Sequence, residues 1–188
     1  MLRKVEEFKK CVAIAGFKNV EINDIDEFLR NVRKRLKHAH AQFFDAKLVA
    51  SKDHLYFAAL NSLKAFENGS NRSRDMAIET LLYATAQRQI RNAVDIIGMT
   101  QNSNDVAVLI ITETEPQADD ALDKISELVS GSRDDAVLEL TEEKFDDIRR
   151  LFRISDMELE AKLVGKGFEM KALVDLVVEH VALLATDH

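Results

Sequence analysis

The sequence predicts an α+β fold in which helices dominate and surround a small, mostly antiparallel central sheet of about four strands. Three observations support this prediction: apolar residues recur at helical spacing, short β-rich apolar runs separate these stretches, and the single proline enforces few breaks. A hydrophobic content of 46% with 31% charged residues is typical of a globular protein. A length of 188 residues suits one domain covering residues 1–188.

The chain is expected to begin with a short strand and a helix. Val12–Phe17 is apolar and closed by a glycine, which predicts a strand. Asp24–Lys37 carries apolar side chains at helical spacing, with Asn23 or Asp24 as its cap. A second strand is expected at Phe43–Ala50.

Two longer helices should follow. The first spans Lys52–Phe66 and is stopped by Asn68 and the glycine after it. After a polar loop at residues 70–74, the second spans Asp75–Ile97, with a glycine past its end. Thr85 marks a point where this second helix could break.

The second half alternates strands and helices. Val106–Ile111 is apolar on both faces, which predicts a central strand. Pro116 should start a helix that ends near Ser130, and Ala136–Leu140 is expected to be a short strand. The remaining predicted elements are helices that begin at Thr141 and Ser155 and close with the apolar segment Met170–Leu184, after an interruption at residues 165–167.

Charge is distributed unevenly along the chain. Residues 1–98 contain 17 Lys and Arg against 12 Asp and Glu, a net of +5, whereas residues 99–188 contain 9 against 21, a net of −12. The two halves sum to the overall charge of −7. One end of the molecule could therefore meet a polyanion and the other a basic protein surface. The alternative is that both are solvated faces.

Several classes of protein are disfavoured. No run of about 18 apolar residues is present, so no membrane span is expected. The first residues lack the apolar region of a secretory signal, which favours a cytoplasmic location. The single cysteine, Cys11, excludes an internal disulfide and a multi-cysteine zinc site, and it is expected to be a small buried residue.

The sequence predicts no catalytic residue, no metal site and no cofactor. The histidines lack the spacing and the acidic neighbours of a metal site, and serine-nucleophile and phosphate-loop motifs are absent. The acidic residues around Glu113 and Asp119 fit a helix start, where carboxylates favour the helix dipole. An enzyme with an unrecognised site remains the less favoured alternative.

RNA-binding candidates are clearer. Residues 30–37 form a basic run without an acid, and Arg72 and Arg74 lie in the polar loop. In the predicted second long helix, guanidinium and amide groups share a face beside an apolar side chain, a combination that suits phosphates and unstacked bases. The alternative is that these arginines are solvent-facing and paired with Asp95 or Glu79. The helix residues concerned are Gln87, Arg88, Gln89, Ile90 and Arg91.

Four segments together resemble a known family. They are residues 44–55, the Ala-Ala-Leu-Asn run at 58–61, the stretch Glu79–Ile90 with its Gln-Arg-Gln-Ile signature, and residues 93–98. They are similar to the kinase-associated, tRNA-binding subunit of the KEOPS complex, the TPRKB family, and most of all to its archaeal members. The resemblance runs from about Ile14 to Leu184.

The resemblance implies a non-catalytic subunit in the synthesis of threonylcarbamoyladenosine in tRNA. In that assembly a transferase subunit performs the chemistry, a small Rio-like kinase bridges it to this subunit, and this subunit captures the single-stranded 3′ CCA tail of tRNA. The alternative is a protein adaptor that regulates the kinase without binding RNA. Ser51 and Ala86 stand where relatives can have glycine. The residues expected to bind tRNA are Arg88, Ile90, Gln87, Gln89, Arg91, His54, Arg72 and Arg74.

Overall fold

The computed structural model describes residues 1–165 and 167–186. Its centre is an antiparallel sheet in the order β1-β2-β4-β3, with the two-residue β5 paired to β2. This confirms the predicted helix-dominated α+β class with an antiparallel sheet. The strands are β1 (Leu2–Val5), β2 (Lys10–Lys18), β3 (His40–Asp45), β4 (Val106–Thr112) and β5 (Ser132–Arg133).

The sheet separates two hydrophobic cores because successive side chains of a strand point to opposite faces. All seven residues of β4 are buried, as its apolar sequence predicts for a central strand. Phe43 packs in the core on one face and its neighbour Phe44 in the core on the other. β3 is the last strand of the ordered path and pairs with β4 over its length, and Phe44 forms a single bridge with Gly98.

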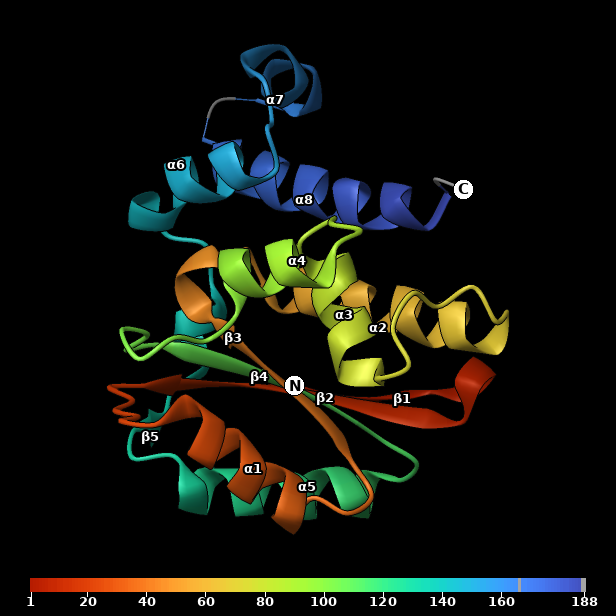
Figure 1. Cartoon of the computed structure of the whole chain (residues 1–188). Helices are drawn as coiled ribbons and strands as arrows, with labels where there is room; N and C mark the ends of the chain where they lie inside the picture. Colours follow the sequence, from red (N-terminus) through yellow and green to blue (C-terminus); the bar gives the residue numbers. More distant parts are fainter. Residues whose placement is uncertain (166, 187–188) are drawn as a thin grey trace.

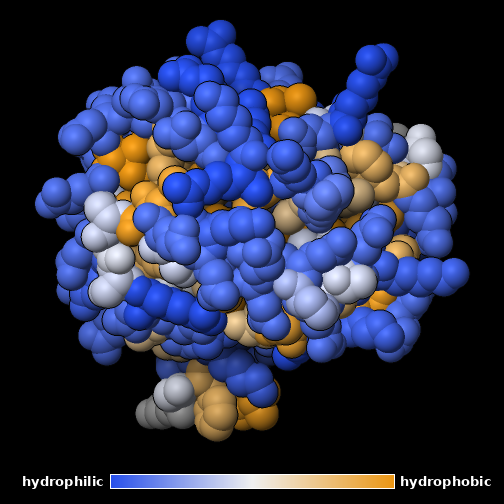
Figure 2. All heavy atoms as spheres, turned by 90° about the horizontal axis from the view of Figure 1, so that it is seen from below, coloured by the Kyte–Doolittle hydropathy of each residue, from blue (hydrophilic) through white to orange (hydrophobic). Residues whose placement is uncertain are grey.

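Helices α1 (Ile25–Arg35) and α5 (Glu115–Leu128) cover one face of the sheet, the lower face in Figure 1. Asp24 caps α1, since its carboxylate accepts a hydrogen bond from the backbone of Glu27 at 2.8 Å. A capping box begins α5, formed by Thr114 and Gln117. Figure 2 shows that the outer surface on this side is largely hydrophilic, with apolar side chains in small separate patches.

The opposite face carries more helices, in two layers (Figure 1). α2 and α3 pack toward the sheet, α8 packs on α2 and α3, and α7 projects beyond α8. Within the described residues, no helix is long and apolar enough to cross a membrane. The helices of this side are α2 (Lys52–Glu67), α3 (Met76–Ala84), α4 (Ile90–Ile97), α6 (Glu142–Leu151), α7 (Asp156–Lys162) and α8 (Glu169–Thr186).

The prediction of a strand at Ala136–Leu140 is wrong. The segment forms a 3-10 helix at Asp135–Leu138, whose apolar residues Val137 and Leu138 enter the core. Its backbone finds partners other than a strand: the Asp134 carboxylate accepts from the amide of Ala136 at 3.0 Å, and Lys144 Nζ donates to the carbonyl of Val137 at 2.5 Å. A short apolar run alone cannot distinguish the two structures.

Two other strands differ from the prediction, one in its bounds and one because it was not expected. The strand expected at Phe43–Ala50 begins earlier, at His40, and ends at Asp45, because the Asp45 carboxylate accepts from the amide of Lys47 at 3.0 Å and starts a 3-10 turn. The first residues, for which no element was predicted, add β1 to the edge of the sheet beside β2.

Candidate RNA-binding surface

The predicted signature residues lie between two helices rather than within one. α3 ends at Ala84 and α4 begins at Ile90, so the break anticipated near Thr85 is confirmed, and the expected sharing of one helical face by Gln87 and Arg91 is wrong. Residues 86–89 form the connection, which we call the signature loop. Arg88 and Gln89 are exposed in this loop, and Gln87 is half-buried.

The start of the signature loop closes the C-terminus of α3. The amide of Gln87 donates to the carbonyl of Leu82 at 3.0 Å, and the amide of Ala86 donates to the carbonyl of Tyr83 at 3.0 Å. This pair of bonds is a Schellman motif, which requires a left-handed residue, and Ala86 adopts a φ of 50°. The Thr85 hydroxyl also donates to the last turn of α3. The geometry of the loop is therefore fixed by the end of the helix.

α4 presents an apolar pair to solvent. Ile90 is 43% exposed and Val94, one turn later, is 42% exposed, whereas Ala93 and Ile97 form the buried side of the helix. Large apolar side chains exposed next to each other on a short helix mark a contact surface more often than isolated ones do.

His54 was predicted to touch RNA, but its side chain is fully buried and does not form part of the surface in this structure. Its Nδ1 accepts from the amide of Ala50 at 3.2 Å, and its Nε2 lies 2.7 Å from the carbonyl oxygen of Ala84, at the end of α3. Burial lowers the pKa of His54 from 6.5 to about 4, so the ring is neutral at physiological pH. Its contacts are with the backbone that supports the signature loop.

The loop that carries Arg72 and Arg74 is held by a buried carboxylate. Glu79 Oε2 accepts from the amides of Arg72 at 2.9 Å and Ser73 at 2.7 Å, and its other oxygen is buried without a hydrogen-bond partner among the described residues. Burial raises the pKa of Tyr83, and a hydrogen bond from the Arg72 side chain partly lowers that pKa again. Arg72 and Arg74 are exposed. Glu79 thus shapes the loop from inside, while Arg91 pairs with Asp95 at 4.0 Å, as the alternative interpretation of the sequence expected.

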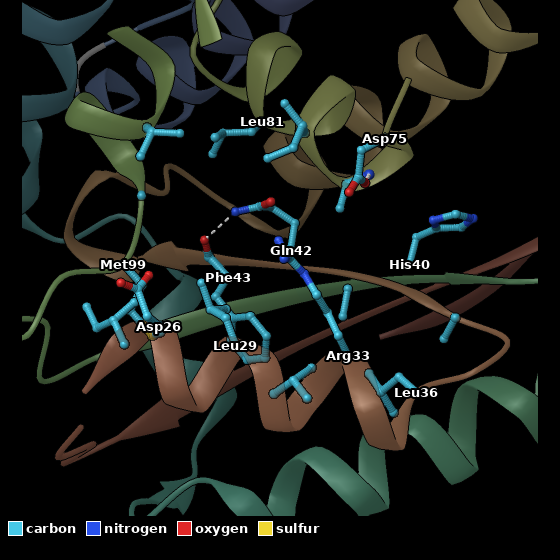
Figure 3. Close-up of a pocket in the computed structure, with 18 residues that line it drawn as sticks. Asp26, Leu29, Arg33, Leu36, His40, Gln42, Phe43, Asp75, Leu81 and Met99 are labelled. Carbon is cyan, nitrogen blue, oxygen red and sulfur yellow. Dashed lines mark hydrogen bonds between the residues drawn. The ribbon is translucent and has the colours of Figure 1, made fainter. Parts of the chain in front are cut away.

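A pocket of about 380 Å³ lies between α1, β3, the start of α3 and the end of α4 (Figure 3). We call it the β3-edge pocket. Most of its lining is apolar, and a few polar side chains converge on it, an arrangement typical of ligand sites. The Gln42 side chain donates to the carbonyl of Phe43 at 2.8 Å within the pocket. The apolar lining includes Leu29, Leu36, Phe43, Leu81, Val94 and Met99, and the polar lining includes Asp26, Arg33, His40, Gln42 and Asp75.

The β3-edge pocket includes one residue of the basic run and reaches the exposed side of α4. Arg33 of the basic run lines it, Arg74 directly precedes the lining residue Asp75, and Val94 joins it to the exposed side of α4. Sequence reasoning missed the β3 residues of this site, because β3 gives no sign that it lies at an edge. Ile90 and Val94 were expected on the inner stripe of the helix, and the structure shows them exposed. Among the described residues, no three His, Cys, Asp or Glu side chains are placed to hold a metal ion.

Comparison with known proteins identifies the family. The model of the family described as kinase binding protein CGI-121 matches residues 17–185. The chain belongs to this family. It is also 33% identical, over 138 residues, to the regulatory protein Cgi121 of Methanocaldococcus jannaschii, covering 73% of this chain and 85% of that relative. These matches confirm the resemblance to the TPRKB family in its archaeal form. They support a kinase-associated, regulatory role.

Proposed function

We propose that this protein is a non-catalytic subunit of the KEOPS complex that supports threonylcarbamoyladenosine modification of tRNA. It binds the 3′ CCA tail of tRNA and docks on the Rio-like kinase, which connects it to the transferase subunit. The observation that carries the RNA part of this proposal is the β3-edge pocket, which has apolar walls and is lined by Arg33 of the basic run.

The pocket suits a single-stranded end better than a duplex. Unstacked bases bind apolar walls, the polar edges of bases bind amide and carboxylate groups, and phosphates bind arginines. Leu29 and Val94 supply walls of this kind, Gln42 supplies an amide, and Arg33 supplies a cation. A double helix is too wide for a pocket of about 380 Å³, whereas one or two splayed bases can enter.

The kinase-docking part of the proposal rests on apolar side chains at α7 and the start of α8. Met157 is 79% exposed, Val164 is 91% exposed and Phe168 is 50% exposed. They lie on the projecting α7 and on its connection to α8, at the side of the molecule opposite α1 and α5 (Figure 1). Exposed apolar side chains gathered on one projection are typical of a protein interface.

The RNA part is tested by measuring the affinity of the full chain for tRNA and for the same tRNA without its CCA tail, at a stated salt concentration. We expect a large loss on trimming. Arg33→Glu should weaken binding of the intact tRNA more than Lys34→Glu does, because both residues are exposed on α1 but only Arg33 lines the pocket. Equal, weak binding of both tRNAs would instead favour a kinase adaptor that does not hold RNA directly.

The kinase part is tested with the Rio-like kinase subunit. Met157→Asp combined with Val164→Asp should weaken kinase binding at least tenfold, because both place a charge on an apolar contact surface. Phe57→Asp is the matched control, since Phe57 is an exposed apolar residue on α2. Unchanged kinase affinity in the double variant, or an equal loss in the control, would refute the placement of this interface.

A further inference from the structure

The buried His54 contacts two separate parts of the backbone. Its Nδ1 accepts from the amide of Ala50 at 3.2 Å, just before α2, and its Nε2 lies 2.7 Å from the carbonyl oxygen of Ala84, the last residue of α3. A neutral imidazole has one donor and one acceptor nitrogen. Because Nδ1 accepts, Nε2 carries the proton and donates to Ala84.

The bond to Ala84 completes the end of α3. The last carbonyls of a helix have no partner within it, and a buried one without a partner is costly. Amides of the signature loop satisfy Leu82 and Tyr83, and Ala84, which is itself buried, receives its bond from His54. The signature loop continues directly from this point, so the imidazole fixes where the loop begins.

Neighbouring groups hold the imidazole in this orientation. The Ser51 hydroxyl accepts from the amide of His54 at 3.0 Å and caps α2, which fixes the backbone that carries the ring. The ring of Phe152 lies edge-on to the imidazole, with centroids 5.6 Å apart. A ring that is fully buried and contacted on several sides has little freedom to turn.

We propose that His54 is a positioning residue for RNA: its Nε2–H holds the carbonyl of Ala84 and thereby presents the signature loop to the tRNA tail. This rests on the proposed binding of the tRNA tail and on the expectation that the exposed Arg88 and Gln89 of the signature loop contact it. It differs from the expectation that His54 touches RNA, because no atom of His54 is exposed.

Two variants separate the two hydrogen bonds. The amide group of glutamine reaches the position of Nε2, and that of asparagine reaches the position of Nδ1. His54→Gln therefore keeps the donor to Ala84 and loses the acceptor for Ala50, while His54→Asn does the reverse. Each variant leaves one buried backbone group without its partner, so a purely structural role for His54 predicts similar damage from both.

The experiment uses the full chain with each substitution and two measurements. Amide hydrogen exchange of Ala86 and Gln87 reports the order of the loop without RNA, and the affinity for intact and CCA-trimmed tRNA reports function. We expect His54→Asn to speed exchange at these amides, and to weaken tail-dependent binding, at least tenfold. His54→Gln should stay within about threefold of the unsubstituted protein in both.

Equal exchange rates in the two variants would overturn the positioning role, whatever the RNA measurement shows. If the exchange rates differ as expected but the unsubstituted protein binds intact and trimmed tRNA equally, His54 positions the loop and the proposed tail-binding function fails. If exchange differs and tail-dependent binding is the same in both variants, the loop is positioned by His54 but does not contact the tail, which also overturns the inference.

Discussion

The burial of His54 makes the stability of the protein depend on pH in a way that one substitution can isolate. Burial lowers the pKa of His54 to about 4 in the folded protein, against 6.5 in the unfolded chain. Between these two values the unfolded chain binds a proton at this position and the folded protein does not. The free energy of unfolding therefore falls as the pH falls from about 6.5 toward 4, and is unaffected by this group above pH 7.

The magnitude follows from the two pKa values. With a folded pKa of about 4 and an unfolded pKa of 6.5, His54 lowers the free energy of unfolding by about 1.4 kcal/mol at pH 5.5 and about 2 kcal/mol at pH 5, relative to pH 7.5. Because the imidazole is fully buried, solvent screening does not reduce this contribution. A loss of 2 kcal/mol is a large part of the stability of an ordinary domain.

The assay is urea unfolding of the unsubstituted protein and of His54→Leu at pH 7.5, 6.5, 5.5 and 5.0. Leucine cannot titrate, so the stability difference between the two proteins should shrink by about 2 kcal/mol over this range, although the variant is less stable at pH 7.5. His38→Leu is the control, because it is the same substitution at an exposed histidine outside the core. A stability difference that stays constant with pH would refute the argument that His54 is buried in its neutral form.

Substitutions at four other residues test the contacts of the loops, the sheet and the expected RNA surface. Glu79→Ala removes the acceptor for two loop amides and should cost about 3 kcal/mol in urea unfolding, against less than half of that for Glu79→Gln, which keeps an amide oxygen. Equal losses would contradict this account. Ala86→Gly should raise the free energy of unfolding by about 0.5–1 kcal/mol in the same assay, because glycine adopts the left-handed φ of 50° without strain. A loss of stability would show that the left-handed conformation does not strain Ala86. Gly16→Ala should lower the free energy of unfolding by about 1–3 kcal/mol, since the added methyl group would lie 2.5 Å from the carbonyl oxygen of Asp134. Unchanged stability would mean that the 3-10 helix at Asp135–Leu138 moves to make room for the methyl group. Arg88→Glu should weaken tRNA binding severalfold at low salt and less at high salt. Equal affinity in the two proteins would remove Arg88 from the RNA contacts.

The fold was predictable from the sequence where one local pattern decides the structure. α1 was expected at Asp24–Lys37 and lies at Ile25–Arg35, because its apolar spacing and its cap act within the helix itself. β4 was expected because its unbroken apolar run, rich in the β-branched residues Val and Ile, is typical of a strand buried on both faces. The prediction of a strand at Ala136–Leu140 was wrong because the backbone of this segment hydrogen-bonds to the side chains of Asp134 and Lys144. The strand propensities of single residues do not account for such side-chain partners.

The candidate site was less predictable because it is assembled from distant segments. The partner of His54 at Ala84 is 30 residues away, so no local pattern distinguishes a buried histidine here from one that contacts a ligand. The signature loop breaks a helical pattern with an alanine in a left-handed conformation, where the usual signal is glycine. The β3-edge pocket depends on the strand order, which places β3 beside α1 and α3.

The strand order also changes the meaning of the uneven charge. The basic α1 and the acidic α5 come from opposite halves of the sequence, yet they lie side by side on one face of the sheet (Figure 1). Arg35 pairs with Glu127 across them at 2.9 Å. The two halves therefore do not form a basic end and an acidic end on this face, and part of the charge is compensated within the molecule.

This compensation bears on how tRNA would be held. A protein with a net charge of −7, whose cations lie partly among acids, gains little from non-specific attraction to a polyanion. Arg33 lines the pocket together with Asp26 and Asp75, so the pocket itself adds little net cationic charge. Affinity for tRNA should then come mainly from the tail in the pocket, and the ratio between intact and trimmed tRNA should stay large as salt increases. A ratio that falls to one at moderate salt would mean that generic electrostatics, and not the β3-edge pocket, holds the RNA.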